Sequence, residues 1–202
     1  MSRGLLNFNI ASFESDNVFD FPPVEAYTEK ISFKDWTGID KAVTASKPLS
    51  DGLHFFEADY KLNRLWEYPD RYIDVLWRYK YVIQPDFSLY YDFPAALQIY
   101  NKYRNHWLAA YYALYGVKVI PKISLSTPDQ YHWAILGYPK RSVVAFCDLG
   151  CVRDKSVNKL LMQSYEYMLK ELDPLQVLYF TRGDNAPSEA TVIKLPYIKG
   201  GK

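Results

Sequence analysis

Cysteine, glycine and methionine are scarce in this sequence, and it contains no long apolar run. Its 202 residues include only two cysteines, nine glycines and three methionines. Two cysteines are too few for the disulfide framework of a small secreted domain. No apolar run approaches the roughly 18–20 residues that span a bilayer, and the first residues lack the apolar core of a secretory signal. We therefore expect a soluble protein of the cytoplasm with reduced thiols.

An excess of either charge is also missing. The 24 basic and 23 acidic residues leave a net charge of +1, which excludes a simple polyanion binder. The charges are unevenly distributed along the chain. Residues 1–60 carry five basic and ten acidic side chains, whereas residues 61–202 carry 19 basic and 13 acidic side chains. The familiar motifs of phosphate loops, dinucleotide sites, zinc proteases and serine hydrolases do not occur. Cys147 and Cys151 are four positions apart, which is not the spacing of zinc or redox sites, so no metal site is predicted.

Aromatic residues, by contrast, are abundant. They make up 17% of the chain, with 19 tyrosines alone. Tyrosine buries a large ring and keeps a hydroxyl group that needs a partner. Most of these rings are expected in the core and at its boundary, and the alternative is a stacking surface for bases or for a protein partner.

Two regions are predicted along the chain. Residues 1–50 show no sustained periodicity and contain Pro22, Pro23 and Pro48, so they predict an irregular N-terminal arm packed on the body. The aromatic residues expected to anchor this arm are Phe19, Phe21, Phe33 and Trp36. Residues 51–202 predict an α/β domain with a short basic C-terminal tail.

Strands and helices alternate after residue 51. Strands are predicted at 53–56, 81–84, 117–125, 142–146 and 175–180. Helices are predicted at 60–80 with a break at Pro69, at 93–115 and at 156–172. Several strands are continuously apolar, which is typical of strands covered on both faces. The pattern predicts an α/β fold with a mostly parallel central sheet of about five strands and helical crossovers. Five strands are too few for a closed barrel, so we expect an open sheet.

Polar residues follow the predicted strands, at the edge where parallel α/β sheets bind ligands. The candidate catalytic residues are the carboxylates Asp59, Asp86 and Asp148. The candidate ligand-binding residues at the same edge are Ser88, Lys122, Ser124 and Arg182. Together they would form a pocket for a phosphate-bearing or polar ligand, which a divalent cation could join. The alternative is that these residues only cap the helices that follow.

The helix at 93–115 carries an unusual polar face. Gln98, Asn101 and Asn105 are spaced three and four residues apart, and Arg104 interrupts the apolar stripe beside them. Asn101 and Arg104 are therefore further ligand-binding candidates, and the alternative is a structural role that orients the loop bearing Asp86. Because an unpaired buried guanidinium is costly, we expect Arg104 to be buried and paired with a carboxylate.

Six short motifs carry a family resemblance over roughly residues 50–180. They are His54-Phe55-Phe56, Pro85 to Ser88, Asn101 with Arg104, Gly116 to Pro121, Gly137-Tyr138-Pro139 and Gly150-Cys151. With these motifs the chain resembles a family of phage, plasmid and bacterial proteins known as domain of unknown function 4417. It departs from the family pattern after Ile123, where Leu125 and Ser126 stand near the position of an expected tryptophan. The resemblance implies a mobile genetic element in a bacterial cytoplasm and assigns no activity or cofactor.

The sequence is compatible with three functions. It does not indicate whether the protein is an enzyme. The first is a ligand-binding or catalytic domain with its site at the strand ends. The second is a DNA- or RNA-binding accessory protein, which the basic balance after residue 60 and the aromatic content favour. The third is an interaction protein that binds a host factor through its acidic, aromatic-rich first 50 residues. No membrane partner is expected, and the oligomeric state is not indicated.

Overall fold

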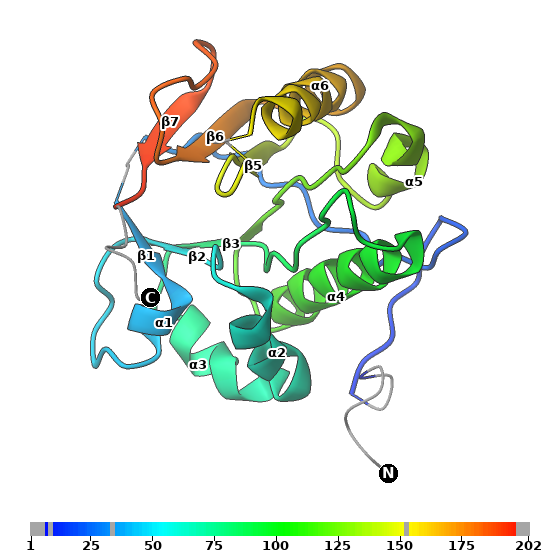
Figure 1. Ribbon diagram of the computed structural model, residues 1–202. Helices are drawn as coiled ribbons and strands as arrows, with labels where there is room; N and C mark the ends of the chain where they lie inside the picture. Colours follow the sequence, from blue (N-terminus) through cyan, green and yellow to red (C-terminus); the bar gives the residue numbers. More distant parts are fainter. Residues whose placement is uncertain (1–6, 8–9, 33–34, 152–153, 197–202) are drawn as a thin grey trace.

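The computed structural model describes residues 7, 10–32, 35–151 and 154–196, in which strands and helices alternate (Figure 1). The strands are β1 (Trp36–Gly38), β2 (Gly52–His54), β3 (Tyr81–Ile83), β4 (Val119–Ile120), β5 (Val143–Cys147), β6 (Gln176–Thr181) and β7 (Thr191–Lys194). The α-helices are α1 (Ile39–Ala42), α2 (Asp59–Glu67), α3 (Ile73–Leu76), α4 (Ala95–Leu114), α5 (Tyr131–Ala134) and α6 (Lys155–Leu172). The predicted α/β class is confirmed. None of the helices in these ranges is long and apolar enough to cross a membrane.

All strand pairs in the described ranges are parallel and follow chain order. Strands β1 to β4 form one sheet and β5 to β7 a second. A parallel bridge between Lys122 and Ala145 joins them, with Ala145 N donating to Pro121 O at 2.8 Å and Ile123 N donating to Ala145 O at 2.9 Å. The estimate of about five strands was too low, because β1 and β7 span only three and four residues. Such short segments leave no readable periodicity.

Side chains of successive strand residues point to opposite faces of the curved sheet. In β6, Leu178 and Phe180 enter a cluster between the two sheets, whereas Val177 and Tyr179 pack on the α6 side. Both faces are therefore covered, which explains why these strands read as continuous apolar runs.

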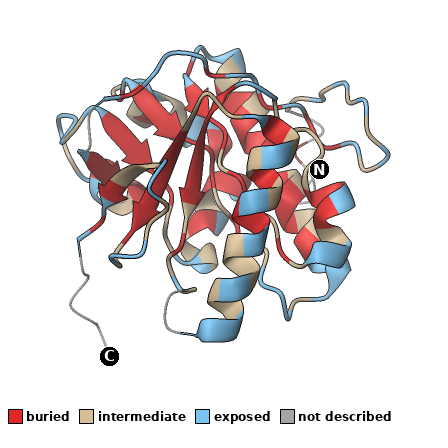
Figure 2. Ribbon diagram, turned by 90° about the horizontal axis from the view of Figure 1, so that it is seen from above, coloured by how far each residue is buried: buried red, intermediate tan, exposed pale blue. Residues whose placement is uncertain are grey.

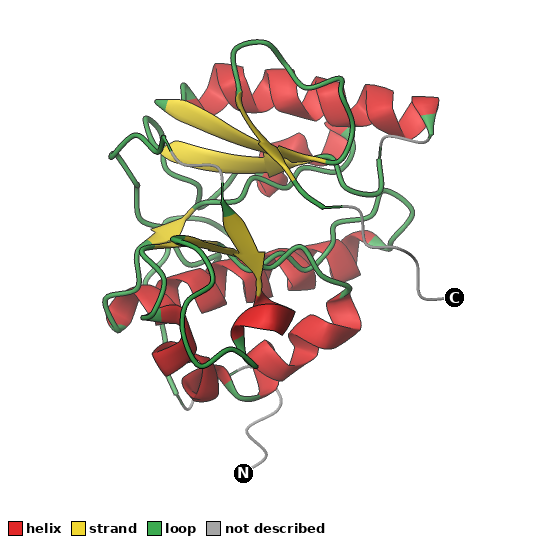
Figure 3. Cartoon of the chain, turned by 90° about the vertical axis from the view of Figure 1, so that its left-hand side faces the viewer, coloured by secondary structure: helices red, strands yellow, loops and turns green. Residues whose placement is uncertain are grey.

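The inner faces of the two sheets meet. Trp36 of β1 packs edge-on against Phe180 of β6 with ring centroids 5.1 Å apart, and Phe56 packs on Phe180 at 4.8 Å. Figure 3 shows the two groups of strands facing each other, with helices on the outside. The two sheets thus face each other across a shared apolar cluster, and their edge strands leave the sheet open, as expected. The described residues of β1 and β7 are not paired with each other.

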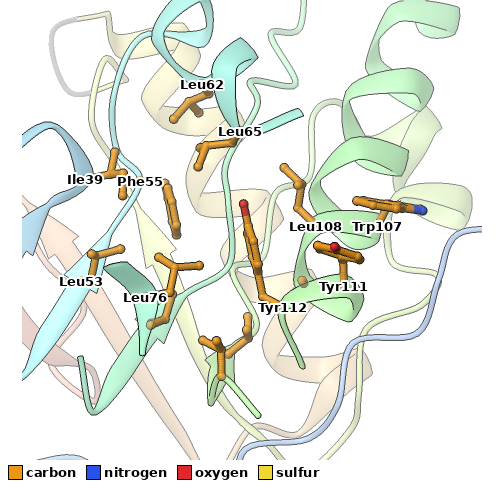
Figure 4. Packing of buried hydrophobic residues seen from close by; sticks show 14 of the residues in the cluster. Ile39, Leu53, Phe55, Leu62, Leu65, Leu76, Trp107, Leu108, Tyr111 and Tyr112 are labelled. Carbon is orange, nitrogen blue, oxygen red and sulfur yellow. The ribbon is translucent and has the colours of Figure 1, made fainter. Parts of the chain in front are cut away.

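Helices α2, α3 and α4 cover the outer face of the first sheet. Their apolar side chains pack on those of β2 and β3 in one cluster, which contains Leu62, Leu76, Leu108 and Tyr112 (Figure 4). The outward faces of the helices are exposed, while the strands are buried (Figure 2). The predicted break at Pro69 is present, because a 3-10 turn at Pro69–Tyr72 separates α2 from α3.

Residues of the predicted arm are built into the body. Phe21 is fully buried, Tyr27 O accepts a hydrogen bond from Val143 N at 2.6 Å, and Ile31 N donates to Gln176 Oε1 at 2.8 Å. Trp36 begins β1, and its ring lies so close to Gly52 that a Cβ atom there would be 2.4 Å from it. The segment at 36–42, assigned from the sequence to the irregular arm, forms β1 and α1. Phe33 and residues 197–202 of the basic tail lie outside the described residues.

Candidate functional site

The carboxyl ends of the strands surround a cavity of about 510 Å³. The lining residues that were candidates from the sequence are Asp86, Ser88, Lys122, Ser124 and Arg182. They come from the segments that follow β3, β4 and β6, so the curled sheet brings together residues that are far apart in the chain. The candidates Asp59, Asp148, Asn101 and Arg104 are not among the described residues that line the cavity.

Lys122, Asp86 and Ser124 form a compact polar cluster in this cavity. The Lys122 amino group donates to Asp86 Oδ1 at 2.7 Å and to Ser124 Oγ at 2.6 Å, and Ser124 Oγ donates to Asp86 Oδ1 at 3.0 Å. Only 10% of the Lys122 side chain and 16% of the Asp86 side chain are exposed. A largely buried ion pair of this kind holds its groups in one geometry.

Neighbouring groups fix the backbone of Lys122. Its N–H donates to Gln84 Oε1 at 3.0 Å, and its carbonyl oxygen accepts from the Tyr138 hydroxyl at 2.8 Å. The Tyr138 ring also lies 3.9 Å from the amino group of the fully buried Lys102. Burial raises the pKa of Tyr138, which therefore stays a hydroxyl donor near neutral pH. Lys122 is thus presented to the cavity by a rigid support.

The turn that carries Asp86 is held by the amide face of α4. Asn105 accepts from Phe87 N at 2.6 Å and donates to Phe87 O at 2.9 Å. Asn101 donates to Ser88 O at 2.7 Å. The two side chains complete the backbone hydrogen bonds of a turn with no sheet partners. Asn101 therefore orients the loop, which is the structural alternative raised by its position on the helix.

Arg104 is buried as expected, with 8% of the residue exposed, but the expected carboxylate partner is wrong. Its guanidinium donates to Asn63 Oδ1 at 3.1 Å and to Asn101 Oδ1 at 2.5 Å, and lies 3.5 Å from the centre of the Phe87 ring. Asp86 is paired with Lys122 instead, at 2.7 Å. Arg104 thus supports the Asp86 turn from behind.

The other two candidate carboxylates have structural partners. Asp59 accepts from Ser88 N at 3.1 Å and from Ser88 Oγ at 2.8 Å, which ties the start of α2 to the Asp86 turn. Asp148 is buried and accepts from Thr181 Oγ1 at 2.7 Å. Burial raises the pKa of Asp148 against the opposing effect of that hydrogen bond. Among the three, Asp86 is the carboxylate that lines the cavity, which makes it the candidate for acid–base chemistry.

The thiols and imidazoles do not form a metal centre. Within the described ranges, no group of three or more His, Cys, Asp or Glu residues could hold a metal ion. Burial raises the pKa of Cys147 to about 12 and raises that of Cys151 as well, so neither is an activated nucleophile.

His54, at the end of β2, is a neutral core residue. Burial lowers its pKa to about 4, with the positive charges of Arg182 and Lys41 acting in the same direction. Its Nδ1 accepts from Phe56 N at 3.2 Å, so the ring proton is on Nε2. This pKa is too low for an efficient general base at neutral pH.

Two tyrosines that the sequence did not single out also line the cavity. Tyr60 is 73% exposed and Tyr90 is 55% exposed, although both belong to a cavity wall. The sequence feature that could have indicated these tyrosines is their position within three residues of Asp59 and Ser88. Composition alone could not find them, because exposed and buried tyrosines look alike in a sequence.

Comparison with known proteins gives relatives from bacteriophages. The chain is 30% identical over 161 residues to the Gene 1 protein of Mycobacterium phage L5, covering 80% of this chain and 69% of that protein. It is 31% identical over 130 residues to the Gene 1 protein of Mycobacterium phage D29, covering 64% of this chain and about half (48%) of that relative's length. No solved structure matches the chain. The model of the family described as Domain of unknown function (DUF4417) matches residues 13–197, and the chain belongs to this phage-associated family.

Proposed function

We propose that the protein binds a polar, phosphate-bearing ligand in the cavity at the carboxyl ends of its strands. The observation that carries this proposal is the Lys122 amino group. An ammonium group has three N–H donors, and two of them have acceptors among the described residues, Asp86 and Ser124. A ligand oxygen in the cavity would accept the third. The host cytoplasm is the proposed location, in keeping with the phage relatives.

The size and charge of the cavity support an anionic ligand of modest size. About 510 Å³ lies within the roughly 300–1,000 Å³ usual for small-molecule sites. The charged side chains on its described walls are three cations and two anions, namely Lys61, Lys122, Arg182, Glu57 and Asp86. Such a small positive excess suits a ligand with one or two negative charges, with Arg182 and Lys122 as its contacts.

A calorimetric titration of the full chain with pyrophosphate tests this proposal. Lys122→Met should weaken binding by tenfold or more, since a charge-assisted hydrogen bond contributes about 1.5–3 kcal/mol. Lys118→Met is the matched control, because Lys118 precedes β4 whereas Lys122 follows it, and Lys118 pairs with Glu29 at the protein surface. The control should bind like the unaltered protein.

A second variant distinguishes a loss of ligand binding from a folding defect. Lys122→Met leaves Asp86 without its cation, so the double variant Lys122→Met/Asp86→Asn removes both charges together. A folded double variant with unchanged pyrophosphate affinity, or an unaltered protein that gives no binding heat at millimolar pyrophosphate, would refute the proposal.

Docking of a host protein through residues 1–50 has less support. Phe21, Val24, Tyr27 and Ile31 are buried in the body, so these apolar side chains are not available to a partner. The folded body also depends on them, and deleting residues 1–50 is expected to abolish the cooperative thermal unfolding transition. A truncated protein with the same unfolding transition as the full chain would instead support docking of a host protein through residues 1–50.

A further inference from the structure

We infer that the ligand of the strand-end cavity is a nucleoside phosphate whose base stacks on Tyr60 and Tyr90; this inference rests on the function proposed above. Both rings line the cavity although 73% of Tyr60 and 55% of Tyr90 are exposed. Aromatic faces open to solvent beside a cationic cavity are the combination with which proteins hold the base and the phosphate of a nucleotide.

The two tyrosines are held by the same pair of residues. Tyr60 follows Asp59 in the first turn of α2, and Tyr90 is two residues beyond Ser88. Because Ser88 Oγ donates to Asp59 Oδ1 at 2.8 Å and Ser88 N donates to it at 3.1 Å, the two backbone segments are fixed to each other. The Tyr90 ring is further supported by an edge contact with Phe93, with ring centroids 5.0 Å apart.

The fixed backbone segments, and for Tyr90 the contact with Phe93, lower the entropy cost of stacking. A group that is already held loses less freedom when a base packs on it. Stacking on an aromatic ring contributes about 1–3 kcal/mol per base and tolerates every base, since each has a π face. The site should therefore distinguish nucleotides from inorganic phosphate more strongly than it distinguishes one base from another.

The polar cluster complements the rest of a nucleotide. Lys122 and Arg182 supply donors for phosphate oxygens, while the Asp86 carboxylate can accept hydrogen bonds from sugar hydroxyl groups. The same chemistry occurs in a free nucleotide and in the terminal nucleotide of a single strand. The experiment must therefore separate these two sources.

The test titrates the full chain with pyrophosphate, with inorganic phosphate, with the four ribonucleoside 5′-monophosphates and their nucleosides, and with a 5′-phosphorylated tetranucleotide. The best mononucleotide should bind at least tenfold tighter than its nucleoside or inorganic phosphate. Tyr60→Ala and Tyr90→Ala should each weaken nucleotide binding by about tenfold, while pyrophosphate affinity stays within about twofold, as expected for an exposed side chain away from its contacts. Tyr91→Ala is the matched control, because Tyr91 is 52% exposed and is not a described residue of the cavity wall; its nucleotide affinity should be unchanged.

The outcomes separate this inference from the proposed function. Pyrophosphate binding that depends on Lys122, with nucleotide affinity insensitive to Tyr60→Ala and Tyr90→Ala, would overturn the nucleotide inference and leave the proposed function intact. Failure of every phosphate compound to bind would overturn both. A tetranucleotide that binds more tightly than the mononucleotides, with an affinity that falls as salt rises, supports the inference with a strand end as the source. Equal affinities support it with a free nucleotide as the source.

Discussion

Replacing Asn105 by alanine should destabilise the protein strongly, because one side chain closes two backbone hydrogen bonds of the Asp86 turn. Asn105 Oδ1 accepts from Phe87 N at 2.6 Å, and Asn105 Nδ2 donates to Phe87 O at 2.9 Å. Phe87 is fully buried, and 3% of Asn105 is exposed. Water therefore cannot easily replace the lost partner.

The magnitude follows from the two stranded backbone groups. A buried donor or acceptor left without a partner costs about 1–3 kcal/mol, so the loss of both partners should lower the free energy of unfolding by about 2–6 kcal/mol. That is a large part of the roughly 5–15 kcal/mol by which a domain of this size is stable. The loss should appear as a lower urea midpoint at an unchanged slope.

Urea unfolding followed by tryptophan fluorescence and by far-ultraviolet circular dichroism measures this loss. Gln163→Ala is the matched control, because Gln163 is an exposed amide within α6, and its substitution should change stability by no more than about 0.5 kcal/mol. If Asn105→Ala is as stable as Gln163→Ala, the amide face of α4 does not hold the turn, and the structural basis of the site is wrong.

Three further predictions concern buried charged and titratable groups. Arg104→Leu should lower the free energy of unfolding by about 3 kcal/mol, and Arg104→Lys by less, because leucine leaves the oxygens of Asn63 and Asn101 without a donor. The folded pKa of His54, about 4, lies below its unfolded value of about 6.5, so the unfolded chain binds the proton first and about 3 kcal/mol of stability is lost as pH falls from 6.5 to 4. His54→Asn, whose oxygen can replace Nδ1 as an acceptor, should flatten that dependence in urea titrations at several pH values. Cys147, with its pKa raised to about 12, should resist iodoacetamide at pH 8 in the folded protein and react once the protein is unfolded in urea.

A specific result would contradict each of these three predictions. A lysine variant at position 104 that is no more stable than the leucine variant would remove the role assigned to the cation. A His54→Asn variant with the pH dependence of the unaltered protein would mean that His54 is not the group that titrates. Alkylation of Cys147 in the folded protein at the rate of a free thiol would mean that its surroundings do not raise its pKa.

The fold could be predicted from the sequence where segments are long and apolar. The helices at 95–114 and 155–172 and the strands at 81–83, 143–147 and 176–181 lie within two residues of the predicted ranges. The curvature could not be predicted, because it depends on contacts between distant residues such as Trp36 and Phe180. Strand β4 was predicted over nine residues and has two, since Pro121 has no N–H to continue a ladder.

The sequence predicts those residues of the candidate site whose positions follow from the order of the strands. Asp86, Lys122, Ser124 and Arg182 follow strands, and parallel strands end at one edge, so their approach follows from chain order alone. The sequence could not say which carboxylate would line the cavity, because Asp59 and Asp148 bind the hydroxyl groups of Ser88 and Thr181, which are 29 and 33 positions away in the chain.

A crystal structure of the full chain with adenosine 5′-thiomonophosphate tests the central claim most directly, because the anomalous signal of sulfur locates the phosphate. Besides the peaks of the cysteine and methionine sulfurs, we predict one peak in the strand-end cavity, with thiophosphate oxygens within hydrogen-bond distance of Lys122 Nζ and of the Arg182 guanidinium. A thiophosphate peak at another surface, or no such peak in the cavity at a ligand concentration that saturates binding in solution, would contradict the assignment of the site.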